Sequence, residues 1–152
     1  MTRLIPIAFL CLISLCGRAQ MPNAAYNQQL ADSMGADKYG MRMYVLVILK
    51  TGPAEITEKA IIDSLFGGHM KNIMRLAEIG KLVVAGPLKK NSHNYEGIFI
   101  FNVKTIEEAN ALVETDPAIK ARLLEAEMYQ WYGSAALPFY LPYHEKVKKN
   151  NF

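Results

Sequence analysis

The chain has 152 residues, of which 51% are hydrophobic and 20% are charged. This composition is that of a single globular domain, and it excludes a disordered or a fibrous protein. The formal net charge is only +3, and no stripe of basic residues stands out in the sequence. We therefore expect no nucleic-acid partner.

The first twenty residues have the pattern of a secretory signal peptide. A basic start at Arg3 is followed by an apolar run and then by the small residues that precede a cleavage site near Ala19. Cleavage would remove Arg3 and Arg18, leaving 15 Lys and Arg residues against 14 Asp and Glu residues. We expect a periplasmic or secreted protein.

Both cysteines, Cys11 and Cys16, lie in this leading segment. The mature chain would therefore lack disulfides and cysteine metal sites. A lipid anchor on Cys16 is the alternative, and it is disfavoured because Leu15 stands where lipoprotein signals have a small residue. The apolar run is too short for a transmembrane anchor, and no later run is long enough, so we expect a soluble mature protein.

The rest of the chain divides into three parts. Residues 20–40 are polar and form an arm, with a short helix expected over Tyr26–Met34, capped by Asn23 and ended by Gly35. Residues 41–133 form the domain. Residues 134–152 form a tail whose aromatic and proline residues are expected to pack on the domain, before a basic end that frays from Lys146.

Hydrophobic periodicity and turn signals predict the elements of the domain. A helix begins at the Thr105–Glu108 capping box, and Asp116 followed by Pro117 starts another. The predicted elements are strands over 41–50, 81–87, 95–103 and 124–132 and helices over 61–80, 106–115 and 117–123. This β-α-β-β-α-β order, with a split second helix, predicts a ferredoxin-like α+β sandwich with a four-stranded antiparallel sheet.

The strands around Val45 and Ile100 are apolar on both faces. Two helices cover only one face of such a sheet, so the other face needs a second layer. The simplest source is the sheet of a second subunit. We therefore expect a homodimer formed through this face.

His69 falls within the apolar stripe of the helix predicted over 61–80. A titratable ring on a buried face needs a hydrogen-bond partner, because an unpaired polar group costs a few kcal/mol there. Gly67 and Gly68 weaken the helix, yet they would allow a ligand or another backbone to approach. The alternative is a satisfied core histidine, with two glycines that kink or start the helix.

Three strings occur in order along the domain: Gly68-His69-Met70, then residues 76–88 (LAEIGKLVVAGPL), then Glu108-Ala109 with residues 115–117 (TDP). Together they resemble the YciI-like (YCII-related) family over about residues 41–132. The resemblance implies a small dimeric α+β barrel whose suspected active site is a His–Asp pair in a cleft. The matching positions are His69 and Asp116.

Asp116 is also fully explained as a helix N-cap. A cap carboxylate can accept a hydrogen bond from a histidine as well, which fixes the tautomer and leaves the other ring nitrogen free as a base. His93 and His144 are expected to be solvated. Three scattered histidines make no metal motif, and no cofactor fingerprint is present, so we expect neither a metal nor a cofactor.

Two hypotheses follow. The first is a cofactor-independent enzyme in which His69, oriented by Asp116, transfers a proton on a small oxygenated compound, by isomerisation or elimination. The second is a non-catalytic module on the same dimer that binds a small ligand or another protein. A pocket that reaches His69 would favour the enzyme, and an enclosed ring would favour the module.

Overall fold

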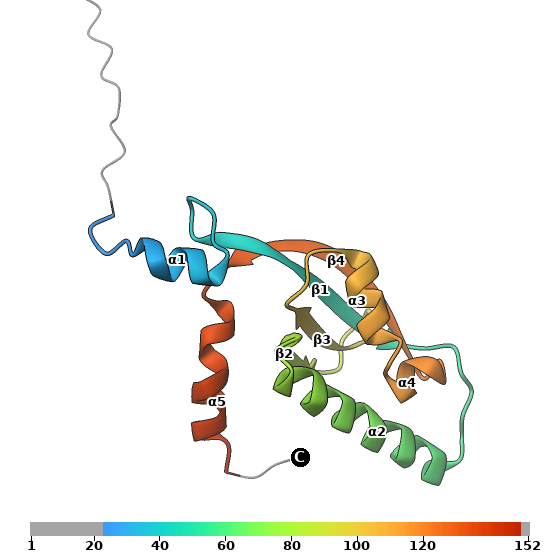
Figure 1. The fold of residues 1–152 in the computed structure, drawn as a ribbon. Helices are drawn as coiled ribbons and strands as arrows, with labels where there is room; N and C mark the ends of the chain where they lie inside the picture. Colours follow the sequence, from blue (N-terminus) through green and yellow to red (C-terminus); the bar gives the residue numbers. More distant parts are fainter. Residues whose placement is uncertain (1–22, 150–152) are drawn as a thin grey trace, which may run out of the picture.

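The computed structural model describes residues 23–149. The signal peptide predicted over residues 1–19, its cleavage site and the alternative anchor at Cys16 lie outside the described residues. The described part is a four-stranded sheet with helices packed on one face, an N-terminal arm and a C-terminal tail (Figure 1). Within residues 23–149, no helix is both long and apolar enough to cross a membrane.

The sheet has the order β2-β3-β1-β4, and each neighbouring pair of strands is antiparallel. Its strands are β1 (Met41–Thr51), β2 (Leu82–Pro87), β3 (Tyr95–Phe101) and β4 (Leu124–Ser134). This order, with one helix between β1 and β2 and another between β3 and β4, is the ferredoxin-like topology. The predicted fold class is confirmed, while closure into a dimeric barrel stays a prediction.

Three helices cover the inner face of the sheet, namely α2 (Lys59–Glu78), α3 (Ile106–Val113) and α4 (Pro117–Lys120). Alternate residues of β1 point towards them, because successive side chains of a strand face opposite ways. The buried core between the layers consists of Val45, Val47, Leu49, Leu76, Leu82, Phe99, Phe101, Val103, Ala109, Val113, Ala118 and Leu124. Each large side chain buried here contributes about 1.5–3 kcal/mol.

Local signals fix where these helices begin and end. The Thr105 hydroxyl accepts from the Glu108 N–H, and the Glu108 carboxylate accepts from the Thr105 N–H, as the capping box predicts. Gly80, at φ +68°, follows the end of α2. Helix α4 starts at Pro117 as expected but ends at Lys120, three residues before the predicted end.

The arm contains the predicted short helix, α1 (Gln28–Met34), but its cap is Asn27 and not Asn23. The Asn27 side chain accepts from the Leu30 N–H at 2.9 Å, whereas Asn23 caps the preceding turn at Ala25. Helix α1 ends at Gly35, as predicted.

The outer face of the sheet is the face that these helices leave bare. Its buried residues Tyr44, Val83 and Ile100 pack with half-buried side chains that include Trp131 and Leu137. Leu137 belongs to the tail, which forms η1 (Leu137–Tyr140) and α5 (Leu141–Val147). The outer face is therefore covered in part by the chain itself.

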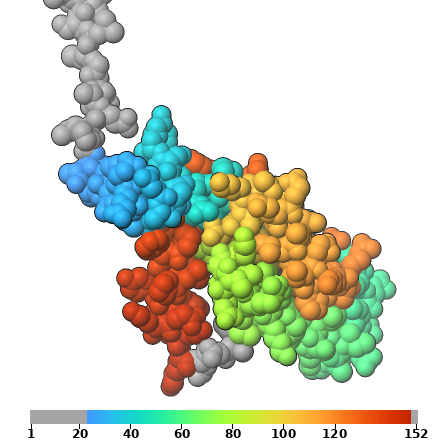
Figure 2. All heavy atoms as spheres, viewed as in Figure 1, coloured from blue at the N-terminus to red at the C-terminus, as the bar shows by residue number. Residues whose placement is uncertain are grey.

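The tail lies against the domain, as predicted, and the Tyr140 hydroxyl donates to the Val83 carbonyl. In Figure 2 the tail, in red, flanks the green part of the domain. Helix α5 continues to Val147, one residue past the predicted start of fraying at Lys146, and the end of the predicted frayed segment, residues 150–152, lies outside the described residues. Other apolar side chains of the outer face remain only half-buried, namely Leu46, Ile48 and Ile98.

Candidate functional site

His69 lies on the inward face of α2 and is only 8% exposed. Its ring stacks on Phe99 of β3, with centroids 5.9 Å apart and planes at 25°. Phe66, one turn earlier on α2, meets the ring edge to face at 6.1 Å. Two aromatic side chains therefore fix the plane of the imidazole between the helix and the sheet.

Gly68 allows helix α4 to approach α2 beside this ring. A Cβ atom at Gly68 would lie 2.9 Å from Pro117 Cγ, closer than such atoms approach, whereas one at Gly67 would meet nothing within 4 Å. The alternative in which the two glycines start the helix is wrong, because α2 begins at Lys59 and runs unbroken through both. Gly68 therefore permits the close approach of α4, and Gly67 has no such role.

That approach brings Asp116, 1% exposed, to the histidine. One carboxylate oxygen, Oδ2, lies 2.7 Å from His69 Nδ1, and the other, Oδ1, accepts the Ala118 N–H at 2.9 Å. The predicted hydrogen-bond partner of the buried ring is thus Asp116. The cap and the pairing with histidine occur together in one side chain, as the sequence allowed.

The surroundings of Asp116 lower the pKa of its carboxyl below the ordinary value of 3.8. Burial acts most strongly and raises the pKa, but the hydrogen bond and charge interaction with His69 and the bonds from Ala118 and Asn72 together outweigh it. The ionised carboxylate therefore stabilises the fold above its ordinary pKa. That contribution is lost as the pH falls through the lowered pKa.

An ionised carboxylate only accepts hydrogen bonds, so Nδ1 of His69 carries the proton and donates it to Oδ2. In the neutral ring Nε2 then holds the free lone pair. Nε2 makes no hydrogen bond to a described residue, and no fully buried side-chain nitrogen or oxygen among residues 23–149 lacks a partner. The side chain is 10% exposed, and we assign that exposure to the edge carrying Nε2.

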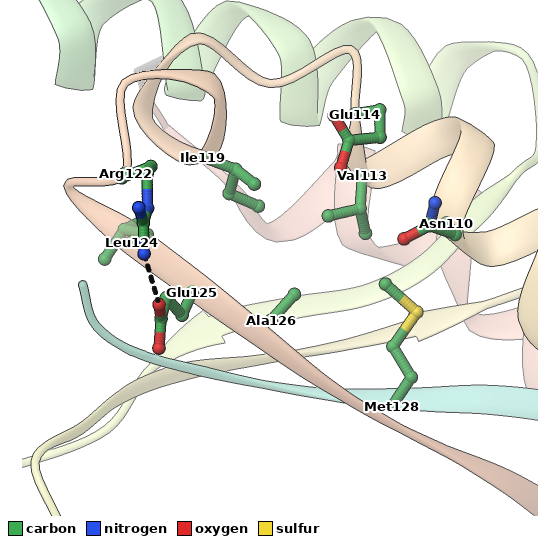
Figure 3. A pocket seen from close by; sticks show the side chains of 9 residues that line it. All are labelled: Asn110, Val113, Glu114, Ile119, Arg122, Leu124, Glu125, Ala126 and Met128. Carbon is green, nitrogen blue, oxygen red and sulfur yellow. Dashed lines mark ion pairs between the residues drawn. The ribbon is translucent and has the colours of Figure 1, made fainter. Parts of the chain in front are cut away.

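Two hollows on the described surface lie apart from the pair, since neither is lined by His69 or Asp116. One, of about 250 Å³, lies between β4 and the α3–α4 segment, with an apolar floor that includes Val113 and Met128 (Figure 3). Its rim carries the Arg122–Glu125 ion pair, 3.7 Å between charged atoms. The other, of about 330 Å³, lies at the β2–β3 turn. Neither of these two hollows therefore gives access to the histidine.

Sequence reasoning missed the side chains that surround the pair. Asn72 is 8% exposed, and its amide Nδ2 lies 3.5 Å from Asp116 Oδ2. Arg75 donates to the Asn72 carbonyl oxygen at 2.7 Å and to Thr115 Oγ1 at 3.0 Å. Asn72 follows His69 by three residues, which makes the two neighbours on the surface of the helix, and the same spacing joins Asn72 to Arg75; that signal was available in the sequence.

The other two histidines stand apart from this site. His93 is exposed in the β2–β3 loop and stacks on Tyr95, and His144 is exposed on α5. Among the residues that the structure describes, no group of three or more His, Cys, Asp or Glu side chains is arranged to hold a metal ion.

No protein-family model matches the chain, and no curated protein matches its sequence. Among solved structures, the chain is similar to 5-chloro-2-hydroxyhydroquinone dehydrochlorinase from Burkholderia phenoliruptrix in complex with 2,5-dihydroxybenzoquinone. The two share 20% sequence identity and a TM-score of 0.44, over 58% of this chain and 92% of that one. A similarity this distant carries no argument about reaction or substrate. The fold class rests on the strand order of the sheet, and membership of the YciI-like family stays a prediction.

Proposed function

We propose that the chain is a cofactor-independent enzyme that transfers a proton on a small oxygenated compound. One observation carries the proposal: the ring of His69 is paired through Nδ1 with the buried carboxylate of Asp116 at 2.7 Å, while Nε2 is left without a described partner. A histidine oriented in this way is the usual arrangement of a general base.

The chemistry assigns a role to each side chain. Nε2 of His69 takes a proton from the substrate, and the negative charge of Asp116 stabilises the imidazolium that forms. In an isomerisation the proton returns to another atom of the substrate. In an elimination the electron pair of the broken bond expels a leaving group, and the proton passes to water. A base positioned in this way accelerates proton transfer by about 10²- to 10⁴-fold.

Deuterium exchange tests this function without knowledge of the natural substrate. Small phenols and lactones are incubated with the protein in heavy water, and the loss of carbon-bound protons is followed by NMR. We expect exchange with at least one compound, and its loss in His69→Gln. The control His144→Gln replaces an exposed histidine of the tail and should exchange like the wild type. Equal exchange in both variants would contradict the proposal.

The second candidate is a non-catalytic module that binds a small ligand or another protein. It is favoured by the position of the two hollows, since neither is lined by the pair. In that case His69 and Asp116 serve to hold α2 against α4. Ligand binding that shifts backbone NMR signals but causes no deuterium exchange, and that survives His69→Gln, would select the module.

The homodimer remains part of the proposal. Ile48 and Ile98 of the outer face are only half-buried, and a second sheet would cover them. Light scattering should give the mass of two chains at micromolar concentration and the mass of one chain for Ile48→Lys, because a charge in the interface is not paired. The control Ile61→Lys, on the exposed side of α2, should remain dimeric. A wild-type monomer at that concentration would contradict the dimer.

A further inference from the structure

The side chains next to the His–Asp pair form a connected chain of hydrogen bonds. Nη2 of Arg75 has two protons and two acceptors in reach, Asn72 Oδ1 at 2.7 Å and Thr115 Oγ1 at 3.0 Å. The single proton of Thr115 has a choice between the Leu112 carbonyl at 2.6 Å and Asn72 Oδ1 at 3.0 Å. Thr115 Oγ1 could meet either end of the Asn72 amide, because a hydroxyl both donates and accepts, whereas Arg75 can only donate.

This arrangement fixes which end of the Asn72 amide faces the pair. A guanidinium donates and never accepts, so the carbonyl oxygen of Asn72 must face Arg75. The amide nitrogen is then turned towards Asp116 Oδ2, 3.5 Å away, and a carboxylate oxygen accepts a proton from it. Flipping the amide would set two donors against each other at Arg75 and two acceptors against each other at Asp116.

The carboxylate is consequently held by both of its oxygens. Oδ1 is bound by the Ala118 N–H at 2.9 Å, and Oδ2 lies within reach of the Asn72 amide and of His69 Nδ1. A carboxylate restrained in this way cannot rotate away from the ring. The proton of the neutral imidazole is then retained on Nδ1, although free histidine in water prefers the tautomer protonated at Nε2.

We propose that Asn72, oriented by Arg75, is a positioning residue that holds the Asp116 carboxylate and so keeps His69 in the Nδ1-protonated tautomer. The inference deepens the proposed function, since it concerns the base of the same site. A purely structural role would be different: Asn72 and Arg75 would tie α2 to the α3–α4 turn, and their loss would lower stability without changing the ring.

The ring nitrogens report the difference directly and without a substrate. Nitrogen-15 NMR of the imidazoles, recorded at a pH of about 9, where an unperturbed histidine is neutral, distinguishes the two tautomers. The His69 signals are assigned by their absence in His69→Gln. In the wild type we expect Nδ1 protonated. In Asn72→Leu and Arg75→Met we expect both nitrogen shifts to move towards the average of the two tautomers.

Matched variants separate positioning from loss of charge or packing. Lys71→Met removes an exposed cation from the same helix, and Arg75→Lys keeps a hydrogen-bond donor at position 75. Both should retain the wild-type tautomer. If Asn72→Leu does not fold, Arg75→Met still gives the answer, since Arg75 is exposed.

The proposal is overturned if the wild-type ring is protonated at Nε2, or if Asn72→Leu and Arg75→Met keep the Nδ1 tautomer, whether or not their melting temperatures fall. Failure of the proposed function has a different signature. The wild-type ring would be in the Nδ1 tautomer and the tautomer would change in these variants, but no protein would catalyse deuterium exchange. That result would support the positioning role of Asn72 and reject the enzymatic function.

Discussion

Asp116→Asn is expected to reduce proton transfer by about 10²- to 10⁴-fold. The amide oxygen of the new side chain is needed at the Ala118 N–H, which now lies 2.9 Å from Oδ1. The amide nitrogen then occupies the place of Oδ2, 2.7 Å from His69 Nδ1, and it donates where the carboxylate accepted. Nδ1 of the ring must therefore become the acceptor, and Nε2 carries the proton and no longer acts as a base.

The fold should tolerate this change. Asparagine caps a helix about as well as aspartate, and it has nearly the same size, so we expect a loss of about 1 kcal/mol or less in the free energy of unfolding. Deuterium exchange and thermal melting measure the two effects. The control Asp63→Asn, on the exposed side of α2, should leave both unchanged. A silent Asp116→Asn in every assay would leave Asp116 as a cap alone.

Gly67→Ala and Gly68→Ala should change stability in opposite directions. Alanine favours a helix over glycine by about 1 kcal/mol at either position. At Gly67 the added methyl group meets nothing within 4 Å, so this gain is kept. At Gly68 it would lie 2.9 Å from the Pro117 ring, and overpacking of this kind costs about 1–3 kcal/mol.

The two alanine variants control for each other, because the gain in helix propensity is common to both. The difference between their unfolding free energies in urea therefore measures the overpacking alone, about 1–3 kcal/mol. Since Pro117 adjoins Asp116, Gly68→Ala should also lengthen the contact with His69 and lower deuterium exchange. Equal stabilisation by both substitutions would mean that α4 does not depend on Gly68 for its place.

Structural features that depend on only a few neighbouring residues were predicted well from the sequence. The capping box at Thr105 and the cap at Asp116 are found as expected, because both are made by neighbours in the chain. The order of the predicted elements along the chain gave the ferredoxin-like topology, which the strand order of the sheet confirms. Asn23 and Asn27 are the same residue type, so the sequence does not show which of them caps α1. The backbone conformation of the arm makes Asn27 the cap.

The tail was predicted to pack on the domain, but no helix was predicted in it. Pro138 and Pro142 stand in the first turns of η1 and α5, where the missing N–H costs nothing and the fixed φ is already helical. The tail thus forms two short helices where no helix was predicted. A proline in the first turn is compatible with a helix, whereas one in the interior is not.

The residues of the candidate site could be predicted from the sequence only in part. His69 was singled out because a buried ring needs a partner, but nothing in the spacing named Asp116, which is 47 residues away; the family resemblance suggested it. Asn72 and Arg75 were missed, although Asn72 is a helix neighbour of His69 and Arg75 a helix neighbour of Asn72. Their role depends on which end of an amide faces which neighbour, and only a three-dimensional arrangement of donors and acceptors fixes that.

Asp116 both caps helix α4 and binds the ring of His69, which is 47 residues away in the sequence. The stability of this short helix therefore affects how the ring is held. Helix α4 has a single turn, and short elements of this kind open locally far more often than the whole domain unfolds. Each opening breaks the Ala118 bond to Oδ1 and leaves the carboxylate held only through Oδ2, by His69 and Asn72. The hydrogen-exchange protection of one backbone amide, that of Ala118, therefore reports how often the carboxylate loses this restraint.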